Sequence, residues 1–121
     1  MKDNQKQTYD LICFTDLAYE LDLSDKPEIE KKIRRRLKYH KLGDFKQERV
    51  DYIRRLNNDL YSEISNPMKS KYFHKRNSNF ADLADFDFDR MTEDYHNKYD
   101  EVDKEDLKGM INFAIYLYYM R

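Results

Sequence analysis

Glycine and proline occur only twice each among the 121 residues of this chain. The turns of β-rich folds depend heavily on these two residues, so their scarcity favours long helices over a turn-rich sheet. Aromatic residues make up 15% of the chain, which supplies large side chains for a core although 39% of the residues are charged. We therefore expect a small, folded, mostly α-helical protein.

The spacing of apolar residues divides the chain into three regions. We expect a basic helical region over residues 1–65, a basic and aromatic connection over residues 66–79, and an acidic segment with an apolar C-terminal helix over residues 80–121. At this length, all three regions fit within one compact domain.

Two helices are predicted in the first half of the basic region. The first covers residues 9–21, either as one helix or as two short helices that break near Thr15. The second covers residues 27–41, and Gly43 follows it as the glycine that ends many helices.

Capping residues predict where further helices begin. A helix over residues 44–65 would open with a capping box formed by Asp44 and Gln47. The C-terminal helix would begin after Asp103 as its N-cap. In residues 80–99 the sequence pattern supports both a helix and a strand, so the conformation of that segment stays open.

Charge is sorted into blocks along the chain, although the net charge is only −1. Residues 1–30 contain three Lys/Arg and eight Asp/Glu, residues 31–76 contain fifteen and five, and residues 80–106 contain three and eleven. A basic block of this kind is the electrostatic footprint of a surface that meets nucleic acid. The acidic blocks would pair with it inside the chain or face a partner.

A segment of about 25 residues resembles the helix-turn-helix of prokaryotic transcriptional regulators. It consists of residues 14–24, which read FTDLAYELDLS, and of the apolar residues Ile29, Ile33 and Leu37 after them. In that family a stretch of the form x-L-A-x-x-L-G-[IVL]-S forms the first helix and the turn. Asp22 stands where the family has glycine, and aspartate can adopt the left-handed conformation that such a turn needs. The resemblance implies that the helix over residues 27–41 enters a major groove of DNA.

The candidate DNA-binding residues are the basic side chains of the helices and of the connection. They are Lys31, Arg34, Arg35, Lys38, Lys41, Lys46, Arg49, Lys71, Lys75 and Arg76. Arg54 and Arg55 would add contacts to the DNA backbone. We expect a small, non-enzymatic DNA-binding regulatory protein of a phage or other mobile element. The alternative for the basic helix over residues 27–41 is a solvated face of an ordinary bundle.

Two other functions fit the sequence. In the first, a set of carboxylates imitates DNA phosphates toward a nucleic-acid-binding protein, as anti-CRISPR and similar inhibitors do. The set is Asp82, Asp85, Asp87, Asp89, Glu93 and Asp94. It does not form a calcium loop, because Arg90 and His96 occupy the positions that need glycine and glutamate. In the second, the chain is a helical adaptor.

The sequence contains no recognisable motif for a metal, a cofactor or catalysis. Cys13 is the single cysteine, and the three histidines lack zinc-ligand spacing. A Gly-rich phosphate loop and a nucleophile elbow are absent, so we expect no enzyme activity and no cofactor.

The N-terminal and C-terminal segments favour a cytoplasmic protein without a membrane partner. Residues 1–10 lack the apolar core of a signal peptide, and the apolar residues 110–120 fall short of the roughly 20 needed to span a bilayer. Because palindromic DNA sites suit symmetric proteins, we expect a homodimer with the C-terminal helix as its interface.

Overall fold

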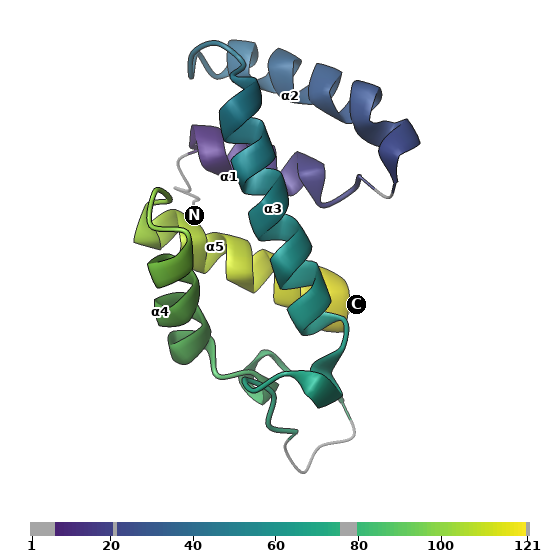
Figure 1. The fold of residues 1–121 in the computed structure, drawn as a ribbon, viewed down its shortest axis with the longest axis vertical. Coiled ribbons are helices and arrows are strands. Elements are labelled where there is room, and N and C mark those ends of the chain that lie inside the picture. The colour runs from purple at the N-terminus through teal and green to yellow at the C-terminus, as the bar shows by residue number, and fades with distance from the viewer. Residues whose placement is uncertain (1–6, 21, 76–79, 121) are drawn as a thin grey trace. The chain divides into compact units, whose positions relative to one another are not determined.

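The structure of the protein is a computed structural model, which describes residues 7–20, 22–75 and 80–120. These described residues contain five α-helices and no strand, so the predicted mostly α-helical fold is confirmed (Figure 1). The chain divides into two compact units, residues 1–54 and residues 55–121. The boundary falls inside α3 (Gln47–Ile64), so both units include a part of this helix.

The first unit consists of α1 (Tyr9–Leu17), the 3₁₀ turn η1 (Leu23–Asp25), α2 (Lys26–Tyr39) and the first two turns of α3. Helices α1 and α2 pack against each other. The buried apolar side chains of this unit are Ile12, Cys13, Phe14, Leu17, Ile33, Leu37, Val50 and Ile53. Burial raises the pKa of the Cys13 thiol to about 12. The 3.6-residue period of the sequence correctly placed Ile33 and Leu37 of α2 on the core side, whereas the buried Ile12 and Cys13 of α1 were not predicted.

Helix α1 begins at a threonine cap and ends earlier than predicted. The Thr8 hydroxyl oxygen accepts a hydrogen bond from the amide of Leu11 at 3.2 Å. Thr15 lies inside the helix, where its hydroxyl donates to the Leu11 carbonyl at 3.0 Å, so the helix does not break there. Instead, the amide of Glu20 donates to the carbonyl of Leu17 at 2.9 Å, a 3₁₀-type bond that tightens the chain after the last helical residue.

Helix α2 ends at Tyr39, and the glycine predicted to terminate it, Gly43, does not do so. Two backbone hydrogen bonds from the residues after the helix close its last turn instead. The Lys41 amide donates to the Lys38 carbonyl at 3.1 Å, and the Leu42 amide donates to the Leu37 carbonyl at 3.0 Å. This pair of bonds is the Schellman motif, which places one residue in the left-handed conformation. That residue is Lys41, with φ of 56°. The prediction was wrong because a lysine occupies the position that favours glycine.

Helix α3 begins at Gln47, and the predicted capping box does not form. The carbonyl oxygen of Asp44 accepts a hydrogen bond from the Tyr9 hydroxyl at 2.9 Å. The side-chain amide of Gln47 donates to Glu30 at 2.9 Å and to Asp51 at 3.0 Å. A capping box needs the Gln47 side chain to accept from the backbone of Asp44, so its tertiary bond to Glu30 replaces that local bond.

Three arginines of the first unit form ion pairs with carboxylates of the acidic block over residues 1–30. Arg36 pairs with Asp16. Arg49 binds both oxygens of Asp10, at 2.9 and 2.7 Å. Arg54 binds both oxygens of Glu20, at 2.8 and 2.9 Å, and also contacts Glu30 at 2.8 Å and Asp51 at 2.5 Å. Planar guanidinium groups suit this forked geometry, so the acidic block neutralises these arginines within the unit.

The second unit contains the rest of α3, then α4 (Phe88–Lys98) and α5 (Lys104–Ile115), with two 3₁₀ turns before α4 and one π turn after α5. These turns are η2 (Pro67–Lys69), η3 (Leu83–Asp85) and η4 (Tyr116–Met120). Residues 80–99 are thus mainly helical. The strand-like pattern at Phe86 produces a single β-bridge, to Phe73.

Helix α5 begins as predicted and is buried within its unit. The Asp103 side chain accepts hydrogen bonds from the amides of Glu105 at 3.1 Å and Asp106 at 3.3 Å. Its apolar side chains Leu107, Met110, Ile111, Ala114 and Ile115 are all fully buried. These five residues of the predicted dimer-interface helix therefore belong to the core, whereas Tyr116 after them is 58% exposed.

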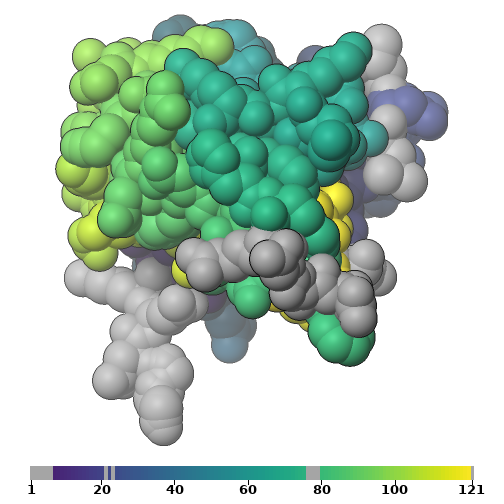
Figure 2. Space-filling view, turned by 90° about the horizontal axis from the view of Figure 1, so that it is seen from below, coloured from purple at the N-terminus to yellow at the C-terminus, as the bar shows by residue number. Residues whose placement is uncertain are grey.

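Within the predicted connection over residues 66–79, the described residues 66–75 are held in place by an aromatic residue, Tyr72. The buried Tyr72 donates a hydrogen bond from its hydroxyl to Asp94 at 2.7 Å, and its carbonyl accepts from the Asp87 amide at 2.8 Å. In Figure 2 the chain that follows α3 lies beside α4. Arg76, one of the candidate DNA-binding residues, lies outside the described residues.

Arg54 is expected to be the most important single charge for the stability of the first unit. In an Arg54→Met variant, three carboxylates lose the cation between them, which should lower the free energy of unfolding by about 3 kcal/mol. Urea unfolding followed by circular dichroism measures this change. Arg35→Met is the matched control, because this arginine is exposed, and it should cost less than about 0.5 kcal/mol. Equal effects of the two substitutions would contradict the role of Arg54.

Candidate nucleic-acid interface

The outward side of α2 presents a row of cations, here termed the basic face of α2. It comprises Lys31, Arg34, Arg35 and Lys38, all of which are exposed. Ile33 and Leu37 are buried on the other side of the same helix. Since residues three and four apart share one side of an α-helix, burial of the apolar residues turns these four cations toward solvent.

Most of the basic face has no partner in the part of the chain that the structure describes. Lys31, Arg35 and Lys38 form no hydrogen bond or ion pair through their side chains with any described residue. The Arg34 guanidinium lies over the ring of Phe45, 4.0 Å from its centroid, which is a cation–π contact that leaves its charge uncompensated. The face therefore retains four positive charges on a single helix.

Two more candidate lysines follow α2 along the chain. Lys41 is the exposed left-handed residue at the end of the helix. Lys46 is exposed too, while its backbone amide donates to the Tyr9 hydroxyl at 2.7 Å. Because the contact of Arg34 with Phe45 brings this connection beside α2, Lys46 lies next to the same surface.

The remaining candidate cations are placed elsewhere. Arg49 is half-buried and bound to Asp10, so it does not belong to the exposed face. In the second unit Lys71 lies 3.6 Å from Asp94, and Lys75 lies 3.8 Å from Asp85. Among the described candidates of the first unit, the structure thus brings together the cations of α2 and of the connection after it. The sequence does not distinguish these cations, because the distinction depends on tertiary ion pairs.

The acidic candidates of residues 82–94 serve mainly within the second unit. Asp82 and Asp87 cap η3 and α4 by accepting from the amides of Ala84 and Arg90. The Lys104 ammonium lies 2.8 Å from Glu93, and Asp94 accepts from the Tyr72 hydroxyl. Asp85 is completely buried and accepts from the Tyr119 hydroxyl at 2.5 Å. Asp89 is the exposed member of this set without a side-chain partner among the described residues.

Tyrosine hydroxyls recur as donors in the second unit, a feature that sequence analysis missed. Besides the bonds of Tyr72 and Tyr119 to aspartates, Tyr118 donates to Asn57 at 2.8 Å and Tyr99 donates to Asp59. Burial and the bond to Asp85 raise the pKa of Tyr119 to about 12. The available signal was the high number of tyrosines, eleven, in a chain rich in aspartate.

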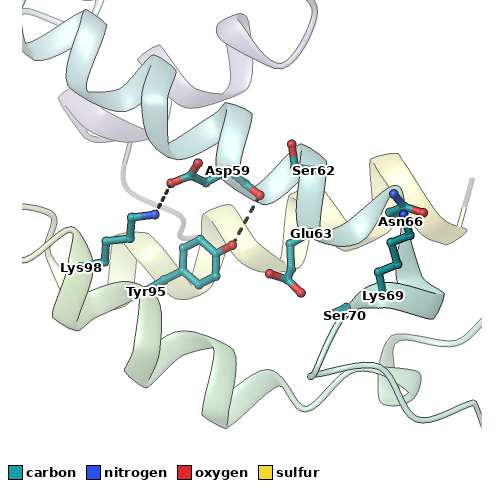
Figure 3. A pocket seen from close by; sticks show the side chains of 8 residues that line it. All are labelled: Asp59, Ser62, Glu63, Asn66, Lys69, Ser70, Tyr95 and Lys98. Carbon is teal, nitrogen blue, oxygen red and sulfur yellow. Dashed lines mark hydrogen bonds and ion pairs between the residues drawn. The ribbon is translucent and has the colours of Figure 1, made fainter.

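An open hollow of about 370 Å³ lies among α3, η2 and α4 of the second unit (Figure 3). Its charged lining residues are Asp59, Glu63, Lys69 and Lys98. Lys98 pairs with Asp59 at 2.8 Å, and although burial opposes the effect, bonds from Lys98 and Tyr99 lower the pKa of Asp59. The two positive and two negative charges balance, so the hollow has no strong field for a charged substrate.

No protein-family model, no curated protein and no solved structure matches this chain. Among the described residues, no group of three or more His, Cys, Asp or Glu side chains is arranged to hold a metal ion. None of the described helices is both long enough and apolar enough to cross a membrane.

Asp85 is expected to be structural, in contrast to its neighbour Asp89. Asp85→Ala removes the buried acceptor of the Tyr119 hydroxyl and should lower the free energy of unfolding by about 2 to 4 kcal/mol. Asp89→Ala should cost less than about 1 kcal/mol, since this residue contributes only its charge at the N-terminus of α4. Urea unfolding of both variants measures the difference. Similar values for the two would show that the Asp85 contacts contribute little.

Tyrosine ionisation should make the protein unstable in alkali. Burial raises the folded-state pKa values of Tyr72, Tyr95 and Tyr119, whereas tyrosines of an unfolded chain ionise near pH 10. The unfolded state then loses protons first, so this stability is complete below about pH 10 and is lost as the pH rises toward 12 and above. Urea unfolding at a series of pH values measures the loss. The slope should be smaller in a Tyr119→Phe variant, and an unchanged slope would contradict this assignment.

Proposed function

We propose that the protein is a small, non-enzymatic DNA-binding protein of the regulatory kind, which contacts DNA through the basic face of α2. One observation carries the proposal. The first unit pairs Arg36, Arg49 and Arg54 with carboxylates but leaves the four cations of this face uncompensated. Like charges on one helix repel each other, and a row of phosphates relieves that repulsion.

Counterion release supplies the energy of such an interaction. Each phosphate that a lysine or arginine neutralises releases condensed cations from the DNA, so affinity depends steeply on salt. The basic face has the size for about four phosphate contacts, and Lys41 and Lys46 extend it. About four phosphate contacts are consistent with weak or moderate DNA binding by one molecule of the protein.

The resemblance to helix-turn-helix regulators supports DNA as the partner less directly. Helices α1 and α2 pack together, as the two helices of that motif do, but residues 18–25 separate them. The turn of the motif has three or four residues, so α2 is presented in a different way. A role in gene regulation, in a phage or other mobile element, rests on this resemblance alone.

The alternative inhibitor function has weaker support. It needs an acidic surface that is free for a partner, whereas five of its six candidate carboxylates bind other groups of the second unit. The adaptor function makes no specific demand on the charges. Both alternatives predict that DNA does not bind, so a single binding experiment separates them from the proposal.

A triple substitution, Lys31→Ala, Arg35→Ala and Lys38→Ala, tests the proposed interface. None of these side chains forms a hydrogen bond or an ion pair with a described residue, so the melting temperature should stay nearly unchanged. Affinity for a labelled duplex, measured by fluorescence anisotropy at low salt, should fall at least about tenfold. The slope of log affinity against log salt should shrink by about 0.9 for each lost phosphate contact.

A charge-matched control excludes a general effect of net charge. Lys69→Ala, Lys104→Ala and Lys108→Ala remove three charges from the second unit. This control should bind DNA nearly as well as the original protein does. Equal losses of DNA affinity in the two triple variants would show that the basic face is not the interface. If the original protein binds no DNA, the proposed function is wrong.

A further inference from the structure

Tyr39 ends α2 with its aromatic ring in solvent. The residue is 80% exposed, and its ring lies nearly perpendicular to the His40 ring, with a centroid distance of 5.0 Å and an interplanar angle of 88°. The Tyr39 hydroxyl forms no hydrogen bond with a described residue. Most other described tyrosines of this chain are at least half-buried, so this ring is unusually accessible.

The position of Tyr39 relates it to the basic face of α2. Arg35 lies four residues earlier in the same helix, and residues at this spacing are neighbours on the helix surface. Lys38 directly precedes Tyr39, and Lys41 follows two residues later. An accessible ring is therefore bordered by cations that have no partner among the described residues. Proteins that bind single-stranded nucleic acid combine these two elements, cations for the backbone and aromatic rings for the bases.

We infer that the basic face of α2 binds single-stranded DNA, with Tyr39 stacked on an unpaired base and the cations on the adjoining phosphates. This inference rests on the proposed function and specifies its substrate. In a duplex the faces of the bases are covered by their stacked neighbours, so the ring finds no partner there. In a single strand each base offers a free face to the tyrosine.

The other residues of α2 also suit a single strand better than a duplex groove. Glu28 is exposed in the first turn of α2, where recognition helices present base-reading side chains, and its carboxylate repels phosphates. The Arg34 guanidinium is held over Phe45, which leaves Arg35 as the uncommitted arginine of the basic face. Its other members are lysines, which bind phosphates as point charges and read base edges poorly.

The test compares Tyr39→Leu with Tyr39→Phe on two probes. These are a labelled oligothymidine of about 16 nucleotides and a duplex of equal length. The original protein should bind the single strand more tightly than the duplex. Tyr39→Leu should weaken binding to the single strand at least about fivefold, since stacking one base contributes on the order of 1 to 3 kcal/mol. It should leave the duplex affinity and the salt slope unchanged, whereas Tyr39→Phe keeps the ring and should bind both probes normally.

Tyr19→Leu is the matched control, because Tyr19 is an exposed tyrosine of the same unit, 50% accessible, that lies outside α2. It should bind the single strand as the original protein does. The inference is overturned if Tyr39→Leu binds the single strand normally, or if it loses affinity for both probes equally. If both probes bind equally and only the triple substitution in α2 weakens them, the proposed function stands and this inference fails. If neither probe binds the original protein, both fail.

Discussion

Arginine–carboxylate pairing in the first unit determines which positive charges of the chain remain available. Arg54 between Glu20 and Glu30, and Arg49 on Asp10, are partly buried pairs with two hydrogen bonds to one carboxylate. Such pairs stabilise a fold only when every charge has its partner, because an unpaired charge is costly to remove from water. The arginines next to the core are consequently neutralised by carboxylates, whereas the cations of the basic face of α2 stay uncompensated.

The second unit also contains many carboxylates, and it satisfies them partly with hydrogen bonds from neutral donors. Several of its carboxylates accept hydrogen bonds from tyrosine hydroxyls or from helix N-terminal amides, as at Asp85, Asp94 and Asp103. A tyrosine contributes apolar area with its ring and a donor with its hydroxyl, so the buried Asp85 receives a hydrogen bond from Tyr119 that is shorter than its 3.8 Å ion pair with Lys75. The abundance of tyrosine and aspartate thus has a structural explanation in this unit, which weakens the argument for an acidic surface that imitates DNA.

Sequence periodicity predicted the helices well because period and local caps are properties of short segments. The core positions Ile33 and Leu37 and the cap at Asp103 follow from residues a few positions apart. One error arose where a distant residue intervened, since the Gln47 side chain donates to Glu30, and another where Lys41 occupies a left-handed position that favours glycine. The candidate interface was predictable only in part for the same reason. Arg49 and Arg35 look alike in sequence, and only the tertiary position of Asp10 separates a structural arginine from an exposed one.

The reactivity of the completely buried Cys13 can report local opening of the first unit separately from the second. It is the single cysteine of the chain, and its thiol ionises only at high pH, so alkylating reagents cannot reach or activate it while α1 stays packed. The rate of alkylation under native conditions then reports how often this unit opens, because the second unit contains no thiol. Alkylation measured in this way gives a free energy of local opening for the unit of residues 1–54, without an engineered probe residue and without unfolding the whole chain.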